Sequence, residues 1–365
     1  MLKKRGFEKN EQKVVWLELL PSSGDQSRDM KLIDIFQKRM THFGLQDNFI
    51  LLYVEAFKNW SKGCYAKDYE KIKFFGKNKE EFEMICRNTD ALLNLWYSVR
   101  PPILNKFNFK ILLDTDPGLL QICALSPNCD MGIGLHDKYF TVGENIGKEW
   151  CSIHTLGIDW IPFRQPVDLD VWVPQINFDC KRFTTLTQWE WESVSYEGRI
   201  IENSKRTQFM EYITLPTLTK QELELAANIH PSLKDDIDLL SRNDWHLVDP
   251  NKVAGDPLSY QKYVAQSRGE FSVAKGVYVQ LKTGWFSDRS ICYLASGKPV
   301  LVQDTGIGDN LPVGYGLLTF RNMSEATEAI DKINSDYLFH CRKAREIAEK
   351  YFNSNLILNR IMKEM

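Results

Sequence analysis

The sequence predicts an α/β protein that is built from two domains of the Rossmann type. The chain has 365 residues, which is more than one small core holds and suits about two domains of ordinary size. Short apolar runs alternate with segments of helical periodicity, as expected where strands are joined by helices. Residues 275–308 (KGVYVQLKTGWFSDRSICYLASGKPVLVQDTGIG) read as strand, glycine turn, helix, glycine stop and strand. That order predicts a βαβ unit on a parallel sheet.

The first half of the chain alternates in this way. The apolar runs expected to form buried parallel strands are 14–17, 49–54, 91–95, 109–113 and 131–135. Residues 30–43 place apolar side chains at helical spacing, and Asn78 followed by Glu81 is typical of a helix start. The N-terminal segment is charged and poor in turns, whereas nucleotide-binding domains usually open with a strand and a glycine-rich turn. We therefore expect the first βαβ unit of this domain to be absent.

The second domain follows a proline-rich segment, in which Pro162, Pro166 and Pro174 indicate a linker. We expect the first domain to cover residues 1–165, the second 166–350, and a final helix 351–365. In the second domain we expect a strand from residue 183, helices near 222–229 and 235–243, a strand at 245–248, a helix at 258–267 and a strand at 271–274. From residue 324 onward apolar side chains recur at helical spacing.

The turn at Thr283-Gly284-Trp285, the helix after it, and Ala295-x-Gly297-Lys-Pro-Val resemble the donor-binding half of glycosyltransferases with the two-domain GT-B fold. The resemblance extends over roughly the last third of the chain. Cys292 stands where those enzymes often have a Glu, and the spacing from Gly284 to Gly297 is longer than in plant-type members. The resemblance implies two Rossmann-like domains that face a cleft, with C-terminal helices that return to the first domain.

The resemblance also implies a function. A hexosyltransferase-like glycosyltransferase would bind a nucleotide-diphosphate sugar in the second domain and an unidentified acceptor in the first, without a further cofactor. Two alternatives remain open: a nucleotide-sugar epimerase of the same fold, and a non-catalytic protein that binds nucleotide sugars. The sequence does not identify the sugar, the nucleotide or the acceptor.

The expected donor site lies around the turn at Gly284, because backbone N–H groups at a helix start attract phosphates. Arginine and lysine side chains would offset the charge of a departing diphosphate, and a glutamate at a strand end can accept ribose hydroxyls. The expected donor-binding residues are Lys205, Arg268, Glu270, Lys275, Thr283, Gly284, Trp285, Ser287, Asp288 and Arg289. The alternative is an ordinary strand-to-helix turn with a packed Trp285, a solvated charged turn at 267–271 and an exposed Lys205.

The expected catalytic residues are His136, Asp137 and Asp116, which we place after apolar strands, where ligands gather in open α/β sheets. A histidine or carboxylate there could take the proton of an acceptor hydroxyl. Asp114 and Asp116 flank a Pro-Gly turn and could instead cap the local backbone. We expect no metal at these two aspartates, and none at Cys123 and Cys129, which lack a second pair of ligands at the usual spacing.

Composition excludes other classes of function. The net charge of −2 and the scattered basic residues argue against nucleic acid as a partner. The longest stretch without Asp, Glu, Lys or Arg runs only from Pro117 to Cys129, far short of the ~20 residues of a membrane-spanning helix. The eight cysteines contain no CxxC pair, which favours reduced thiols in a cytoplasmic protein.

Overall fold

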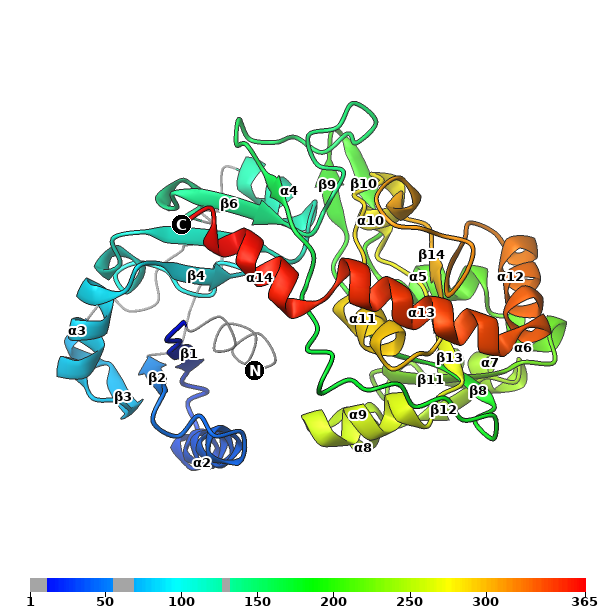
Figure 1. Ribbon diagram of the computed structural model, residues 1–365, viewed down its shortest axis with the longest axis horizontal. Coiled ribbons are helices and arrows are strands. Elements are labelled where there is room, and N and C mark those ends of the chain that lie inside the picture. The colour runs from blue at the N-terminus through cyan, green and yellow to red at the C-terminus, as the bar shows by residue number, and fades with distance from the viewer. Residues whose placement is uncertain (1–11, 55–68, 127–131) are drawn as a thin grey trace.

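The computed structural model describes residues 12–54, 69–126 and 132–365 and shows two α/β domains side by side (Figure 1). The first domain contains two sheets. One has the order β1(Trp16–Pro21)-β2(Phe49–Val54)-β3(Lys73–Gly76), in which β3 is antiparallel to β2. The other is parallel, with the order β4(Leu92–Leu95)-β5(Lys110–Asp114)-β6(Lys138–Thr141)-β7(Ile161–Pro162). The helices are α2(Gln26–His42), α3(Lys79–Asn88) and α4(Leu119–Leu125).

The start of helix α3 follows from side-chain capping. The Asn78 side chain accepts a bond from the amide of Glu81, and the Glu81 carboxylate accepts one from the amide of Asn78. These two bonds satisfy amides that the first helical turn leaves unpaired. The capping box predicted from the sequence is confirmed.

The second domain is a six-stranded parallel sheet with helices on both faces. Its order is β12(His246–Val248)-β11(Glu222–Asn228)-β8(Arg182–Gln188)-β13(Gly269–Ser272)-β14(Val300–Gln303)-β15(Leu317–Phe320). In chain order this is third, second, first, fourth, fifth and sixth, which is the doubly wound Rossmann arrangement. A hairpin of β9(Val194–Tyr196) and β10(Arg199–Ile201) follows β8.

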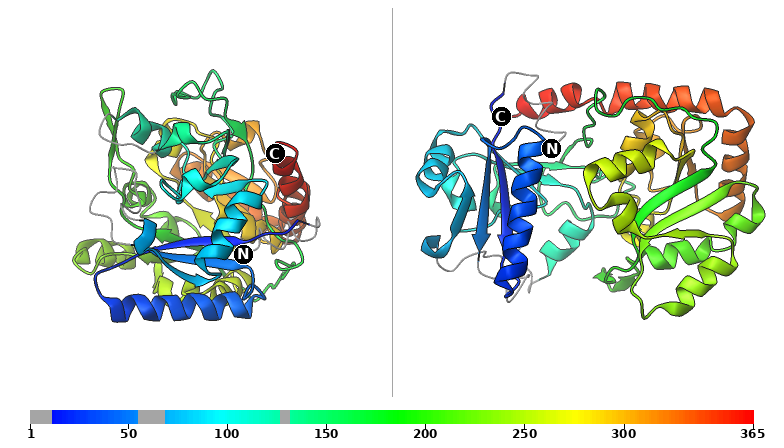
Figure 2. Two further views of the ribbon diagram at one scale, coloured as in Figure 1. Left: turned by 90° about the vertical axis from the view of Figure 1, so that its left-hand side faces the viewer. Right: turned by 90° about the horizontal axis from the view of Figure 1, so that it is seen from below.

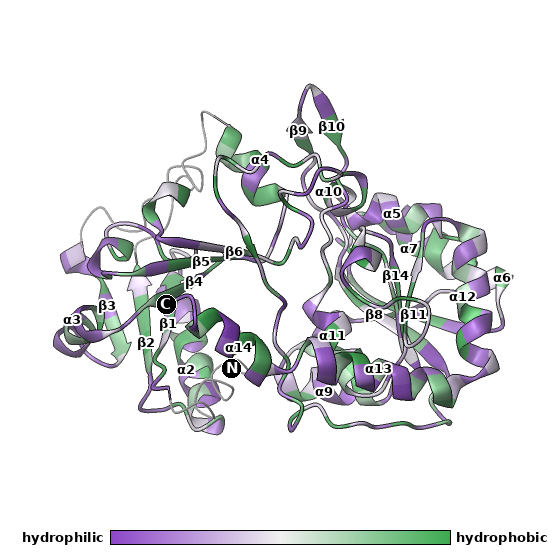
Figure 3. Ribbon diagram, turned by 45° about the horizontal axis from the view of Figure 1, so that its top comes forward, coloured by the Kyte–Doolittle hydropathy of each residue, from purple (hydrophilic) through white to green (hydrophobic). Residues whose placement is uncertain are grey.

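The helices of this domain are α5(Lys205–Glu211), α6(Leu215–Leu218), α7(Lys234–Arg242), α8(Pro250–Ala254), α9(Pro257–Ala265), α10(Gly276–Gln280), α11(Asp288–Ala295), α12(Met323–Ser335) and α13(Tyr337–Tyr351). Successive strand residues point to opposite faces of a sheet. Accordingly, Leu301 packs with α5, α7 and α12 on one face, while Val300 and Val302 pack with α11 and α13 on the other. Figure 3 shows polar and apolar positions alternating along α12 and α13, as expected for helices with one face buried against the sheet and the other exposed to solvent.

The C-terminal helices return to the first domain, as predicted. Figure 2 shows α13 running on into α14(Ser354–Met362), which lies along the first domain. On α14, Ile357, Leu358 and Ile361 pack against Ile111, Leu113 and Phe140 of strands β5 and β6. Among the described residues, no helix combines the length and the apolar character that crossing a bilayer demands.

Three predicted elements are wrong. Residues 222–229 form strand β11 instead of a helix, because Leu223 and Leu225 face one side of a sheet that is covered on both faces. Residues 275–282 contain the short helix α10, and its buried side chains, Val277, Tyr278 and then Leu281, have helical spacing. The strand of the βαβ unit is therefore β13.

The third error concerns the predicted strand 131–135. Residues Ile133–Leu135 form a single 3₁₀ turn after Gly132, which has a left-handed backbone, and residue 131 lies outside the described part. The strand of this region, β6, begins later, at Lys138.

We predict that Leu358→Ala lowers the free energy of unfolding by about 2–5 kcal/mol, as expected when a buried leucine leaves a cavity. Leu358 is 1% exposed, whereas Leu356 on the same helix is 58% exposed. Leu356→Ala serves as the control and should change stability by less than about 0.5 kcal/mol. Urea unfolding followed by tryptophan fluorescence measures both. Equal losses would show that α14 does not anchor the first domain through its buried face.

Candidate functional site

The candidate site lies where the order of the second sheet reverses, between β8 and β13. In open α/β sheets this point leaves a crevice beyond the carboxyl ends of the two strands. Lys275 lies three residues after the end of β13, at the N-cap of α10. Lys205 begins helix α5 after the hairpin, and Arg289 lies in the first turn of α11. Three cations from separate segments therefore converge at this point.

Lys205 is the least compensated of these cations. It is 5% exposed, and its ammonium has no hydrogen-bond acceptor within the described residues. The pKa of Lys205 lies well below its ordinary value, because burial penalises the charged form and because Arg289 and Lys275 are nearby. A buried cation in this state gains free energy when an anion binds beside it.

Glu270 and Arg289 also have unused hydrogen-bonding capacity. Glu270 is fully buried, and neither carboxylate oxygen has a partner among the described residues. Burial raises the pKa of Glu270, against the opposing charges of Arg289 and Lys205. Arg289 Nη2 donates to Ser272 Oγ at 3.4 Å, while Nε has no partner in the described part of the chain. Each buried polar group left unpaired costs about 1–3 kcal/mol, so this arrangement suits a polar ligand.

The first domain contributes Asp116 to the same place. Lys275 Nζ lies 2.7 Å from Asp116 Oδ2, and the Tyr278 hydroxyl donates to Asp116 Oδ1. Burial, and then Asp116, hold the pKa of Tyr278 well above its ordinary value, so the phenol keeps its proton. The Tyr278 ring stacks on Trp285 with centroids 4.4 Å apart, and Lys275 Nζ lies 4.0 Å from the ring centroid of Trp191.

The turn around Gly284 has a different role from the predicted phosphate cradle. The Gly284 amide donates to Thr305 O at 2.8 Å, and the Trp285 amide donates to Thr283 Oγ1 at 3.2 Å. Asn145 of the first domain packs directly onto this turn. A Cβ at Gly284 would lie 2.9 Å from Asn145 Cγ, and one at Gly306 would lie 2.8 Å from Asn145 Nδ2. These glycines allow the domains to approach each other.

Helix α11 begins later than predicted, at Asp288 instead of Trp285. Its N-cap is Ser287, whose hydroxyl accepts from the Arg289 amide at 3.2 Å. Within the described chain, the amides of Phe286, Ser287 and Asp288 have no acceptor. The donors available to an anion therefore lie one turn beyond Gly284, beside Arg289.

The structure separates His136 and Asp137 from this cluster. Both precede β6, so they lie at its amino end, whereas Asp116 lies beyond the carboxyl end of the neighbouring β5. Strand β6 spans four residues, or roughly 13 Å. His136 Nε2 lies 2.9 Å from Asn94 Nδ2, Nδ1 lies 3.2 Å from Ile133 O, and Asp137 accepts from the Lys110 amide at 2.8 Å. Burial lowers the pKa of His136, which favours the neutral ring.

Arg268 is likewise remote, because it precedes β13 and therefore lies at the opposite edge of the second sheet. Its guanidinium carbon lies 3.8 Å from the Tyr337 ring centroid, and its Nε donates to Asn334 Oδ1 at 2.9 Å. Of the residues predicted as donor-binding, Lys205, Glu270, Lys275, Ser287, Asp288 and Arg289 lie together, and Thr283, Gly284 and Trp285 form the adjoining turn.

Three residues of the site were not predicted from the sequence. Tyr278 was assigned to a strand, and Trp191 carried no distinguishing signal. Asn145 lies in a loop that contains glycines. Such a loop indicates that another backbone segment can approach closely, but it does not indicate which segment. Asp114 was considered as a metal ligand and as a cap of the local backbone, and its Oδ1 accepts from the Asp116 amide at 3.0 Å. It accepts from Thr141 Oγ1 at 2.8 Å and Gln121 Nε2 at 3.1 Å, and burial raises its pKa to about 6.

Among the described residues, no group of three or more His, Cys, Asp or Glu side chains is arranged to hold a metal ion. Cys129, weighed as a zinc ligand with Cys123, lies outside the described residues.

No family model matches the sequence, and no curated protein does. Solved structures do match over nearly the whole chain. The crystal structure of Anabaena HepE in complex with UDP-glucose matches with a TM-score of 0.55 and 10% identity, covering 95% of this chain and 98% of that one. The HepE complex with UDP and glucose matches with a TM-score of 0.52 and 11% identity, covering 96% and 99%.

The chain has the GT-B fold. At this level of identity the match establishes the architecture alone, and it agrees with two Rossmann-like domains and a C-terminal helix that returns to the first. In GT-B terms, the cluster around Lys205 and Arg289 belongs to the second domain, and Asp116 faces it from the first.

We predict that Gly284→Ala destabilises the contact between the domains more than Gly157→Ala does. Both glycines have a positive φ, +72° and +71°, so alanine is strained in both by about 1–2 kcal/mol. Gly157 has open space around it, whereas a Cβ at Gly284 meets Asn145, which adds about 1–3 kcal/mol of overpacking. Thermal unfolding of the two variants measures the difference. Equal shifts in Tm would mean that Asn145 does not pack tightly onto this turn.

Proposed function

We propose that the chain is a glycosyltransferase that binds a nucleotide-diphosphate sugar at the cluster of Lys205, Glu270 and Arg289. One observation carries the proposal: the Glu270 carboxylate and Arg289 Nε, buried at the switch point of the second sheet, lack hydrogen-bond partners within the described part of the chain. They include both donors and acceptors. A ligand with a polyanionic part and a hydroxyl-bearing part matches this set, and a nucleoside diphosphate has both.

The chemistry of each part can be assigned to residues. Lys205, Arg289 and the amides of residues 286–288 would hold the diphosphate, because charge-assisted bonds to phosphate oxygens are among the strongest in proteins. The Glu270 carboxylate would accept the two ribose hydroxyls. As the glycosidic bond breaks, negative charge grows on the diphosphate, and the same cations would stabilise it in the transition state.

Asp116 is the carboxylate that faces this cluster from the first domain. In transfer, the acceptor hydroxyl oxygen bonds to the anomeric carbon, while the bond from that carbon to the diphosphate oxygen breaks. Where the reaction inverts the anomeric centre, the hydroxyl proton passes to Asp116. Lys275 would lie between the two charges, bonded to Asp116 and close to the diphosphate.

Of the two HepE structures named above, one contains UDP-glucose and the other contains UDP and glucose. This likeness in fold makes UDP and UDP-glucose the first ligands to test.

We predict that UDP binding is accompanied by proton uptake. The pKa of Lys205 is depressed in the free protein, and a diphosphate beside it would raise that pKa, so the neutral fraction of the amine takes a proton from solvent and becomes the ammonium. Affinity should therefore fall as the pH rises. Calorimetry in buffers of different ionisation enthalpy measures the uptake. Lys205→Met should abolish it and weaken UDP binding at least tenfold, which corresponds to about 1.4 kcal/mol.

Lys298→Met is the matched control for this experiment. Lys298 is also buried, and its Nζ has no hydrogen-bond partner in residues 12–54, 69–126 and 132–365. Burial likewise lowers its pKa, but it precedes β14 at the opposite edge of the sheet. Its removal should leave UDP affinity within about twofold. If the two variants bind UDP equally well, the ligand does not lie at Lys205.

We predict that Asp116→Asn lowers transfer about 10²–10⁴-fold, the usual contribution of a general base, while donor affinity is retained. The assay measures UDP release from UDP-glucose with and without a panel of mono- and oligosaccharide acceptors. UDP released only when an acceptor is present supports transfer. Isomerised sugar nucleotide would indicate an epimerase, and binding without turnover would favour the non-catalytic alternative.

A further inference from the structure

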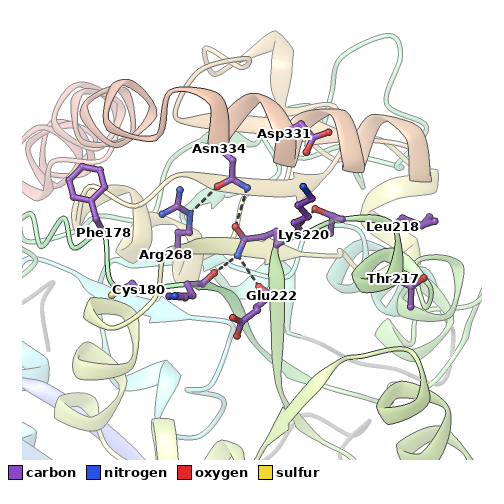
Figure 4. Close-up of a pocket in the computed structure, with 12 residues that line it drawn as sticks. Phe178, Cys180, Thr217, Leu218, Lys220, Glu222, Arg268, Asp331 and Asn334 are labelled. Atoms are coloured by element: carbon purple, nitrogen blue, oxygen red, sulfur yellow. Dashed lines mark hydrogen bonds between the residues drawn. The ribbon is translucent and has the colours of Figure 1, made fainter.

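A cavity of about 920 Å³ lies at the amino edge of the second sheet, away from the cluster described above (Figure 4). It opens where β8, β11 and β13 begin, and the last turn of α12 borders it. Its lining combines the aromatic ring of Phe178, the apolar Leu218, and polar side chains between them. The proposed function uses none of these residues.

A continuous chain of hydrogen bonds fixes the polar part of the lining. Arg268 Nε donates to Asn334 Oδ1 at 2.9 Å, and Asn334 Nδ2 donates to Gln221 Oε1 at 3.1 Å. Gln221 Nε2 in turn donates to the carbonyl oxygens of Glu222, at 3.0 Å, and Lys181. Figure 4 shows this series crossing the cavity from α12 to the strands. Planar amide and guanidinium groups held in this way present donors and acceptors in set directions.

An exposed aromatic ring lies beside this series. Phe178 is 62% exposed, yet its ring makes an edge contact with Tyr337, with centroids 5.8 Å apart. Tyr337 also carries the Arg268 guanidinium over its face at 3.8 Å. The exposed Phe178 ring thus contacts Tyr337, which also holds Arg268, the first donor in this series of hydrogen bonds.

The charges around the cavity do not favour an ion of either sign. Lys181, Lys220 and Arg268 are opposed by Glu222 and Asp331. In addition, α9 and α12 end here, at Ala265 and Ser335, and helix C-termini carry partial negative charge. Cations at this edge are therefore partly neutralised, so an anion gains little.

We propose that this cavity binds an oligosaccharide. A sugar ring has an apolar C–H face that packs on an exposed aromatic ring, and hydroxyls that both donate and accept hydrogen bonds. A ring such as Phe178 beside fixed amide and guanidinium groups meets both needs. The volume is near the upper end of small-ligand sites, which are ~300–1,000 Å³, and suits several linked sugars better than one. The site does not depend on the proposed function.

The test is calorimetric titration of the whole chain with soluble tetra- to hexasaccharides of glucose, N-acetylglucosamine, mannose and galactose. We expect at least one to bind, and expect Phe178→Ala and Asn334→Leu each to lower its affinity at least tenfold. Trp150→Ala is the control, since Trp150 is an exposed aromatic residue of the first domain, 53% exposed, and should leave the affinity unchanged.

Lys205→Met separates this site from the donor site, because it should abolish UDP binding and leave oligosaccharide binding intact. The proposal is overturned if no oligosaccharide of the panel binds with a Kd below about 10 mM, or if Phe178→Ala and Trp150→Ala bind alike. It is also overturned if Lys205→Met removes both ligands, which would place the sugars at the donor cluster.

Discussion

The position of one domain against the other depends on Asn145. Its Nδ2 donates to the carbonyl oxygens of Lys282 and Gly306, both at 3.0 Å, and its Oδ1 accepts from Lys148 Nζ and Asn310 Nδ2. Its backbone amide donates to Thr283 O. Every donor and acceptor of the buried side chain is used, mostly by turns of the opposite domain, so another residue type would leave groups unpaired. An apolar cluster that joins Leu120 to Val277 supports this contact.

Because Asn145 fixes the contact between the domains, Asp116 of the first domain lies against Lys275 of the second, beside the other cations of the cluster. Burial of this kind costs free energy, since Lys205 and Glu270 each lose hydration without gaining a hydrogen bond from the residues that the structure describes. A sequence optimised for stability alone would place apolar or paired residues there. Several such groups gathered at the switch point support the proposed role in binding, whereas the single Lys298 lies at the opposite edge of the sheet. The contrast with Asp236 supports this view, because that buried carboxylate accepts from both Arg206 and Trp189.

The sequence was sufficient where the local pattern decides the structure. The capping box at Asn78, the helix at 235–243 and the apolar face of α14 all follow from local spacing. It was insufficient where burial on both faces removes periodicity. The run at 222–228 has apolar and polar residues that suit a strand or a helix, and only its place between β8 and β12 selects the strand. The division at residue 165 and the absence of a first βαβ unit stay predictions.

The same limit applies to the site. Lys205, Glu270, Lys275 and Arg289 were predicted from their positions near strand ends and turns, and they lie together. Arg268 was predicted by the same reasoning and lies at the other edge, because a residue just before a strand and one just after it are separated by the whole strand. His136 was misplaced for a related reason. It was predicted to follow a strand at 131–135, but it precedes strand β6. Direction along a strand, more than proximity to it, decides which edge a side chain reaches.

Lys275 connects the domain contact with the chemistry of the cluster. An ammonium has three donors in fixed tetrahedral directions, and Asp116 takes one of them at 2.7 Å. A phosphate oxygen could take another without breaking the bond to Asp116, so donor binding need not separate the domains. The Tyr278 hydroxyl, which keeps its proton, also donates to Asp116. The Asp116 carboxylate therefore accepts one hydrogen bond from each domain-contact donor, Lys275 and Tyr278. In the proposed reaction, Lys275 would then contact both the donor diphosphate and the base, and so would link the two sides of the transfer.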